Sequence, residues 1–213
     1  DIMVYVPHVN VVIVGAMASG KTTMLKEFIN RGYNPVISCT TRPKRLGEKD
    51  GVDYHFVTDE SFDAGLAWND LAAVRTYNTV DGVWRYGIGY KNIPDDKDNV
   101  FILDPEGLMD IETKLPNIFG VYLDVDENIR MERALSRAYA TNENISEIQR
   151  RFADDRIVFG SDGFGNPKWY MEHCKVRCWA NDEYTRTTIE EVDRIERFIK
   201  LYKKQLRSDH ESN

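Results

Sequence analysis

The sequence predicts an α/β protein in which a parallel sheet is flanked by helices and interrupted by an inserted β-rich segment. Short continuous apolar runs, typical of strands buried on both faces, alternate with segments of helical periodicity. This alternation favours a doubly wound core, because parallel strands need a crossover between them. Residues 39–93 break the rhythm, since they are rich in Gly, Tyr, Thr and Arg and contain short alternating pieces.

The elements follow in order from the β-branched run at residues 9–14, which predicts the first strand. The last helix has an apolar stripe at helical spacing, and Thr187 with Glu190 matches a capping box at its start. Residues 161–167 form a turn-dense loop. Further strands are predicted at residues 36–38, 100–103, 119–123 and, more weakly, 175–179, and further helices at residues 21–30, 58–68, 106–115, 126–138 and 145–159.

Composition limits the classes of function. The 213 residues are 42% hydrophobic and 30% charged, which is ordinary for one globular domain with inserted subdomains. The net charge of −7 disfavours binding of nucleic acid through a basic surface. The sequence contains neither an apolar run of membrane-spanning length nor a signal pattern, so we expect a cytoplasmic protein without a membrane partner. It makes no prediction about the oligomeric state.

The three cysteines predict no disulfide framework, because they are few and unevenly spaced. Cys174 and Cys178 lie near His173, but a second ligand pair is missing from the sequence. Buried thiols are therefore favoured over a zinc site.

The most specific motif is Gly-Ala-Met-Ala-Ser-Gly-Lys-Thr at residues 15–22, directly after the first strand and before a helix. Glycines let successive backbone N–H groups point at phosphate oxygens, and the helix N-terminus adds partial positive charge. Lys21 is expected to reach the β- and γ-phosphates, and the Thr22 hydroxyl to ligate Mg²⁺. An ordinary glycine turn is disfavoured by this context. The motif predicts that the chain binds a nucleoside triphosphate through Gly15, Ala16, Met17, Ala18, Ser19, Gly20, Lys21, Thr22 and Thr23.

A second cationic segment follows the second predicted strand. Residues 42–45 carry three cations in four positions, and Arg42 and Arg45 have planar forks that suit phosphate. From composition alone, a solvated basic turn is the more frequent explanation of such a charge run.

Residues 38–57 read Ser-x-Thr-Thr-Arg-x-x-Arg-x-Gly-Glu-x-x-Gly-x-Asp-Tyr-x-Phe-Val, which resembles guanylate kinases position by position. The resemblance implies that Arg42, Arg45 and Tyr54 hold the phosphate of an acceptor nucleotide. It also implies that Ser38 lies near the acceptor base. These roles come from the family, and the sequence of this segment matches the family at each of the positions.

Weaker similarities continue along the chain, so that the resemblance covers residues 9–205. Tyr86-Gly87 is similar to a step whose tyrosine touches the acceptor phosphate, and Asp104 with Glu106 resembles an Asp-x-Asp at a strand end. The remaining matches concern the helical lid of the family and its adenine site. Arg133 and Arg137 resemble the arginine pair at the entry to the lid, and Arg151 resembles the third lid arginine, for which Arg150 is nearly as good a match. Asn181 is similar to the first residue of the family's Asn-Asp pair beside adenine.

The departures from the family concern the base. Ala73 stands where guanylate kinases have a glutamate that reads guanine, and Ile88 replaces a serine or threonine. Glu106 is longer than the family's aspartate. A site that loses such hydrogen bonds can lose orders of magnitude in discrimination. Nearby side chains that are candidates to compensate are Arg75, Asp81 and Arg85.

The resemblance implies a P-loop kinase that transfers the γ-phosphoryl group of ATP to a nucleoside monophosphate, GMP or dGMP, with Mg²⁺. It implies a core of residues 1–38, 95–136 and 170–213, an acceptor-binding subdomain of residues 39–94 and a helical lid of residues 137–169. The implied catalytic residues are Lys21, Arg42, Arg133, Arg137 and Arg151; the acceptor residues are Ser38, Arg42, Arg45, Tyr54, Tyr86, Asp104 and Glu106; the metal residues are Thr22 and Asp104; and Asn181 joins the loop in binding ATP.

Simpler interpretations of two groups stay open. Residues 130–156 hold six arginines and no lysine, yet surface ion pairs with neighbouring carboxylates can explain them. Asp104 can serve only as a helix N-cap.

Two rival functions also stay open. One is a kinase of different or broader base preference, which Ala73 and Ile88 motivate. The other is an inactive guanylate-kinase-like module that binds phosphorylated ligands, against which the intact loop at residues 15–22 argues.

Overall fold

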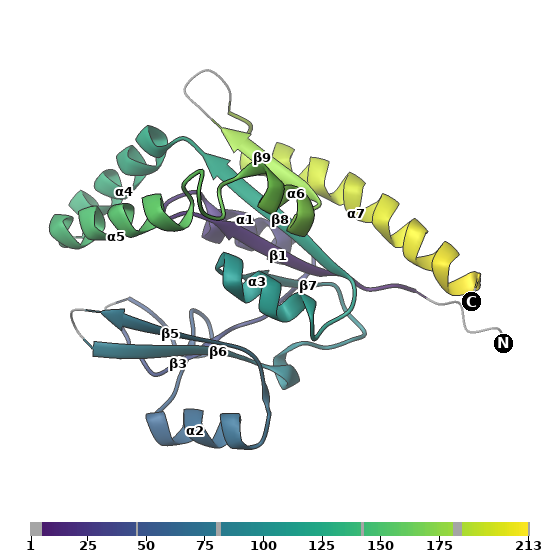
Figure 1. The fold of residues 1–213 in the computed structure, drawn as a ribbon, viewed down its shortest axis with the longest axis horizontal. Helices are drawn as coiled ribbons and strands as arrows, with labels where there is room; N and C mark the ends of the chain where they lie inside the picture. Colours follow the sequence, from purple (N-terminus) through teal and green to yellow (C-terminus); the bar gives the residue numbers. More distant parts are fainter. Residues whose placement is uncertain (1–5, 46, 80–81, 142, 181–184, 213) are drawn as a thin grey trace.

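The predicted parallel sheet forms the centre of the computed structural model (Figure 1). The structure describes residues 6–45, 47–79, 82–141, 143–180 and 185–212. The sheet has the order β2-β7-β1-β8-β9, and each neighbouring pair is parallel. Because sequential strands are separated by crossovers, their carboxyl ends meet at one edge, where α/β proteins bind ligands. The strands are β1 Asn10–Gly15, β2 Asn34–Pro35, β7 Asn99–Ile102, β8 Ile118–Val125 and β9 Val176–Ala180.

Helices cover both faces of this sheet, which confirms the doubly wound class. They are α1 Lys21–Asn30, α3 Pro105–Glu112, α6 Pro167–His173 and α7 Thr188–Glu211. Side chains alternate along β1, so Val11 and Ile13 join the core under α1 and α7, whereas Val12 and Val14 join the core under α3 and α6. The capping box of Thr187 and Glu190 is present at the start of α7.

Residues 39–93 form a second sheet with the order β4-β3-β6-β5, as the broken rhythm predicts. Its strands are β3 Cys39–Thr40, β4 His55–Phe56, β5 Leu71–Thr79 and β6 Gly82–Gly89, with α2 Asp59–Ala67 between β4 and β5 and a short 3₁₀ turn η1 at Tyr90–Asn92. The pairing of β5 with β6 is antiparallel and places Ala73 opposite Ile88 and Arg75 opposite Tyr86.

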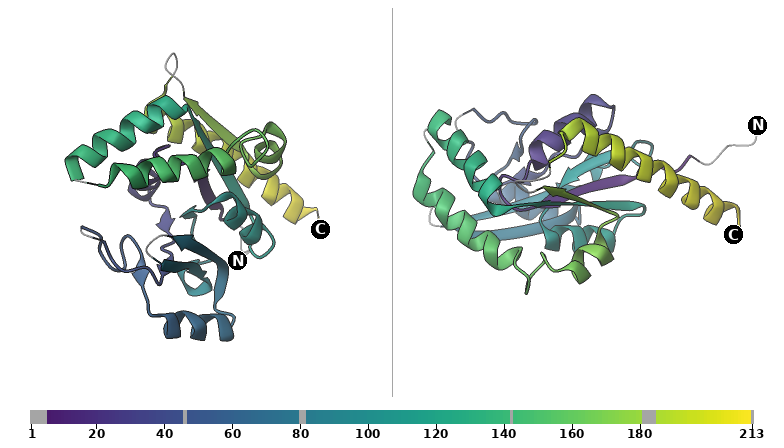
Figure 2. Two further views of the ribbon diagram at one scale, coloured as in Figure 1. Left: turned by 60° about the vertical axis from the view of Figure 1, so that its left-hand side comes forward. Right: turned by 90° about the horizontal axis from the view of Figure 1, so that it is seen from above.

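A pair of helices, α4 Glu127–Thr141 and α5 Ile145–Val158, follows β8. Both helices pack against the loop after β1: Ala134 and Ala138 of α4, Ile148 and Phe152 of α5, and Met17 of the loop share one apolar cluster. Figure 2 shows that this pair and the second sheet project from the core in two different directions.

The sequence predictions differ from the structure at two elements, one strand that is wrong and one helix that was missed. Residues 36–38 are not a strand: β2 ends at Pro35, and after one further bond from the Val36 amide to the Val100 carbonyl the chain leaves for the second sheet. Helix α6 was not predicted, although Asn166 caps it and Pro167 begins it. It covers an apolar face of the core, where Tyr170 stacks on Tyr122 at a centroid distance of 5.2 Å.

The cysteine thiols of residues 174 and 178 lie in packed surroundings, and Cys178 is buried. Burial raises the pKa of both thiols to about 12, so they are protonated at neutral pH. None of the helices that the structure describes is long and apolar enough to span a bilayer.

Candidate active site

The loop from Gly15 to Lys21 joins β1 to α1 and has a geometry that few residues permit. A Cβ on Gly15 would lie 2.7 Å from Ser19 Oγ and 2.9 Å from the Leu123 carbonyl oxygen, so a larger residue does not fit. Gly20 has φ of 99°, where a residue with a Cβ is strained. Side chains do not cap α1 in the structure as described, so its first amides are available to an anion.

Lys21 lies against this loop, with Nζ donating to the carbonyl oxygens of Gly15 at 2.7 Å and Ala16 at 2.8 Å. Burial lowers its pKa to about 8, while Asp155 acts to raise it and Arg151 and Arg130 act to lower it. The lysine is therefore surrounded by groups of the α4–α5 pair. A polyanion bound here would restore its full charge.

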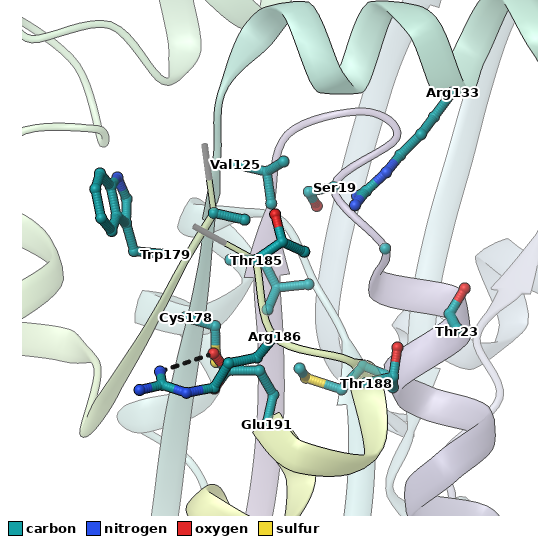
Figure 3. Close-up of a pocket in the computed structure, with 14 residues that line it drawn as sticks. Ser19, Thr23, Val125, Arg133, Cys178, Trp179, Thr185, Arg186, Thr188 and Glu191 are labelled. Atoms are coloured by element: carbon teal, nitrogen blue, oxygen red, sulfur yellow. Dashed lines mark hydrogen bonds and ion pairs between the residues drawn. The ribbon is translucent and has the colours of Figure 1, made fainter. Parts of the chain in front are cut away.

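A cavity of about 320 Å³ opens beside the loop (Figure 3). It is lined by Ser19 and Thr23 from the loop and α1, by Arg133 from α4, and by Thr185 and Glu191 from the segment around the start of α7. The ends of β8 and β9 form its back wall. Arg186 pairs with Glu191 at 3.3 Å on one side. Asn181, expected near adenine, lies outside the described residues.

On the second sheet, Arg42 is buried, with 6% of its surface exposed. Its guanidinium forms a bidentate pair with Glu48 at 2.8 and 3.0 Å, and Nε donates to the Tyr86 hydroxyl at 3.3 Å. It also lies over the rings of Tyr54 and Phe56, at 5.4 and 5.7 Å. A solvated basic turn is therefore the wrong description of Arg42.

Three tyrosines continue from Arg42 along one wall. Tyr54 packs edge-on against Tyr86, and Tyr86 packs edge-on against Tyr77, with centroid distances of 5.7 and 5.5 Å. The Tyr77 hydroxyl donates to Asp104 Oδ2 at 2.5 Å, and burial followed by Asp104 raises the pKa of this phenol. Tyr77 was not predicted. The alternation of Arg75 and Tyr77 on one strand face could have indicated it.

Asp104 does cap α3, since its Oδ1 accepts from the Gly107 amide at 2.7 Å. It also contacts Arg75, whose Nε lies 3.4 Å from the same oxygen. Arg75 reaches further carboxylates of α3, Glu106 at 3.8 Å and Asp110 at 3.5 Å. The N-cap interpretation is correct but incomplete, because Asp104 belongs to a charged network between the second sheet and α3.

The residues that depart from the family pattern and the described candidates to compensate for them lie on two different faces of β5 and β6. Ala73 and Ile88 are 3% and 2% exposed and pack with the core under α3. Arg85 lies on the opposite face, where it pairs with Asp59 and Asp63 of α2. Of the three candidates to compensate, Arg75 faces the network of Asp104, Arg85 does not, and Asp81 lies outside the described residues.

The arginines of α4 and α5 also divide. Arg150 pairs with Glu147 at 2.8 Å and Asp154 at 2.6 Å, as the surface interpretation expects. Arg137 pairs with Glu143 at 3.2 Å. Arg133, by contrast, lies 3.5 Å from the Ala18 carbonyl.

Arg151 of α5 lies near cations of two segments, Lys21 after the loop and Arg45 after β3. Burial and then the charge of Arg45 lower its pKa, and it in turn lowers that of Lys21. Within the described residues, no carboxylate lies within ion-pair distance of the Arg45 or Arg151 guanidinium. Two guanidinium groups that repel each other without a paired carboxylate mark a place for a multiply charged anion.

Two further residues at the loop were not predicted. Arg130 is buried and donates to the carbonyls of Met17 and Val125. Asp155 of α5 accepts from the Met17 amide at 2.5 Å and lies 3.6 Å from Arg130. The arginine run gave no signal that a carboxylate reaches the loop.

The comparisons with known proteins point to one family. The family model described as guanylate kinase matches residues 8–159. The chain is 36% identical over 115 residues to a guanylate kinase of Thermotoga maritima, covering 53% of this chain and 55% of that protein. It is 33% identical over 154 residues to a guanylate kinase of Leifsonia xyli, covering 69% of this chain and 58% of that protein.

The chain thus spans little more than half the length of these two curated relatives. A crystal structure of guanylate kinase from Anaplasma phagocytophilum matches with a TM-score of 0.59 at 20% identity, covering 94% of this chain and 89% of the other. This likeness concerns the fold.

Proposed function

The chain belongs to the guanylate kinase family, and from that premise we propose that it transfers the γ-phosphoryl group of ATP to the phosphate of GMP or dGMP. The observation that carries the proposal is the position of Arg151 of α5, which acts to lower the pKa of Lys21 in the loop and whose own pKa is lowered by burial and by the charge of Arg45, between β3 and β4. One cation therefore lies between two anion cradles. A phosphoryl group in transit needs such a position.

The donor lies along the loop and the adjoining cavity in this proposal. The amides of residues 15–23 and Lys21 hold the phosphates, and the cavity beside Ser19 and Thr23 takes the adenosine. Arg133 and Arg137 come from the helix that enters the lid, and Arg151 comes from the lid itself. Asn181 is assigned to adenine on the resemblance alone. The contact of Arg133 with the loop supports its part in this group.

The acceptor lies along the tyrosine wall. Arg42, Tyr54 and Tyr86 hold its phosphate, because they contact one another at one end of the wall. Arg45 joins them on the resemblance. Glu48 occupies the Arg42 fork and holds it in a fixed orientation. The base lies at the other end, toward Ser38, Arg75, Asp104 and Glu106.

We assign the base to guanine on chemical grounds. Carboxylates such as Asp104 and Glu106 accept from its N1–H and N2 hydrogens, and the fork of Arg75 donates to O6 and N7. Arg75 thereby assumes part of the recognition that Ala73 and Ile88 cannot supply, since these two are buried in the apolar core.

The residues fit Mg²⁺ at Thr22, because its hydroxyl is exposed on the first turn of α1. Asp104 is the second candidate, through a bound water, since both of its oxygens already accept hydrogen bonds from the protein. When bound, Mg²⁺ neutralises phosphate charge and orients the triphosphate.

The chemistry needs no general base. A phosphate monoester has a second pKa near 6, so the acceptor is already ionised at neutral pH. The protein must instead hold two polyanions in line and exclude water, by Lys21 and the loop amides on one side and Arg42 and Arg45 on the other. Arg151 then stabilises the charge between them.

We propose the same division of the chain as the resemblance implies: core residues 1–38, 95–136 and 170–213, acceptor-binding residues 39–94 and lid residues 137–169. The separate second sheet and the projecting α4–α5 pair support it. We also propose a cytoplasmic location, because the proposed substrates, ATP and a nucleoside monophosphate, are intracellular metabolites.

The test is an acceptor screen with coupled detection of ADP. We expect GMP and dGMP to be the best acceptors among the common ribo- and deoxynucleoside monophosphates, and activity to require Mg²⁺. A preference for another base would contradict the guanine assignment but retain the kinase. If every acceptor is inert and Mg-ATP does not bind, the kinase proposal fails in favour of a phospholigand-binding module.

A further inference from the structure

A carboxylate of the lid lies at the main-chain cradle for phosphate. Asp155 Oδ2 accepts from the Met17 amide at 2.5 Å, and 19% of the Asp155 side chain is exposed. The same oxygen lies 3.6 Å from Arg130, which itself donates to the Met17 carbonyl at 3.3 Å. The loop therefore holds an anion supplied by its own chain.

The electrostatics match this description. Asp155 acts to raise the pKa of Lys21 against the effect of burial, and Arg130 and Arg151 act to lower it. Asp155 also acts to raise the pKa of Arg151. Asp155 thus contributes to balancing three cations around the loop, together with Glu127 beside Arg130 and Glu147 near Arg151.

We propose that Asp155 is an internal substitute for phosphate, which holds α5 against the loop and which the triphosphate of ATP must displace. The inference rests on the proposed binding of ATP by this loop. A carboxylate and a triphosphate bound at the same loop repel each other. The Met17 amide has one hydrogen, so it cannot donate fully to both of them. The contact therefore lowers the affinity for ATP.

The displacement has a consequence for Arg151. Asp155 follows it by four residues on α5, so the two side chains lie on one face of the helix. Because Asp155 acts to raise the pKa of Arg151, a triphosphate that displaces the carboxylate also takes over its electrostatic effect on this arginine.

A purely structural role for Asp155 predicts the opposite result. If the carboxylate only neutralises buried Arg130, its removal leaves this charge with Glu127 alone among the described carboxylates, at 3.9 Å, and weakens the binding site. If it competes with phosphate, its removal strengthens binding. The sign of the change in ATP affinity therefore separates the two roles.

The experiment is calorimetric titration of the full chain with Mg-ATP and, separately, with inorganic tripolyphosphate. The variants are Asp155→Asn and Asp155→Ala, with Asp154→Asn as matched control, because Asp154 is its neighbour on α5 and pairs with Arg150 instead. We expect the Kd for both ligands to fall about tenfold in both Asp155 variants and to stay within twofold in the control. Steady-state kinetics should show a lower KM for ATP with an unchanged KM for the acceptor.

Equal or weaker binding in the Asp155 variants, relative to Asp154→Asn, overturns the inference and leaves the proposed function intact if the wild type binds Mg-ATP. Failure of every protein to bind Mg-ATP overturns both. The alanine variant and melting curves guard against a misleading result from asparagine, which can still accept the Met17 hydrogen bond. If the Asp155→Asn protein is unfolded and the Asp155→Ala protein is folded, the Kd values of Asp155→Ala decide the outcome.

Discussion

The proposed donor and acceptor sides of the site use different parts of the chain to bind anions. The donor side is built from main-chain amides of a loop fixed by the packing around Gly15 and by Gly20, with one lysine folded against it. The acceptor side is built from side chains of a separate sheet, with Arg42 buried between rings and fixed by Glu48. Main-chain sites depend on local conformation, whereas side-chain sites depend on which distant elements meet.

The largest expected effect is on kcat and follows from removing Lys21, the lysine that lies against the loop of the donor side. Lys21→Ala should lower kcat by roughly a thousandfold, because a preorganised charge on the transferring phosphoryl group is lost. Steady-state kinetics at saturating ATP measure it, with melting curves to show that the protein is folded. Turnover within tenfold of wild type would show that the amides alone suffice.

Arg42→Ala should lower kcat/KM for the acceptor by roughly a hundredfold and leave the Kd for Mg-ATP within twofold, because Arg42 belongs to the other cradle. Arg42→Lys retains the charge but loses the fork that Glu48 holds in a fixed orientation, so it should recover only a small part of the loss. Fluorescence or calorimetric binding of each nucleotide separately checks the split. A comparable loss in ATP affinity would mean that the two sides are not independent.

The two sides also differ in how far sequence could predict them. The loop is set by spacing within eight residues, and its glycines, Lys21 and the helix after it all lie where the motif indicates. The capping box before α7 is equally local and equally predictable. Interactions between neighbours in the chain are visible in the chain.

Interactions between distant segments were not visible. Tyr77 joins the site only because β5 pairs with β6 and meets Asp104 at the end of β7. Asp155 reaches the loop across 138 positions of sequence, and nothing in the chain near residue 155 indicates this contact. Residues 36–38 have strand-like composition, yet the chain turns away to the second sheet there. Tertiary context overrides composition in each case.

A smaller effect compares the backbones of the two sides. Gly15→Ala should raise the KM for ATP about tenfold, because the added Cβ meets the Leu123 carbonyl and Ser19. Gly47→Ala makes the same change on the acceptor side, in the loop between β3 and β4. Gly47 has φ of +87°, and an added Cβ would meet no heavy atom of the described residues within 4 Å, so only conformational strain arises. We expect it to raise the KM for the acceptor severalfold and to leave ATP unaffected. Kinetics with each substrate varied in turn distinguish the two patterns.

The smallest expected effect concerns the base and uses two arginines on opposite faces of the second sheet. Arg75 lies with Asp104 and Glu106, whereas Arg85 pairs with Asp59 and Asp63 on the far side. Arg75→Ala should lower the ratio of kcat/KM for GMP over AMP about fivefold, because adenine lacks the O6 acceptor of guanine. Arg85→Ala should leave this ratio unchanged.

Competition between the two nucleotides in one reaction gives the ratio directly. Equal ratios in both variants would show that Arg75 only joins the second sheet to α3, through its contacts with Asp104 and Asp110. The acceptor side would then select its base by the carboxylates alone. In that case the base selectivity of the acceptor side would depend on few side chains, as phosphate binding on the donor side does. The two sides would then differ only in how they hold phosphate.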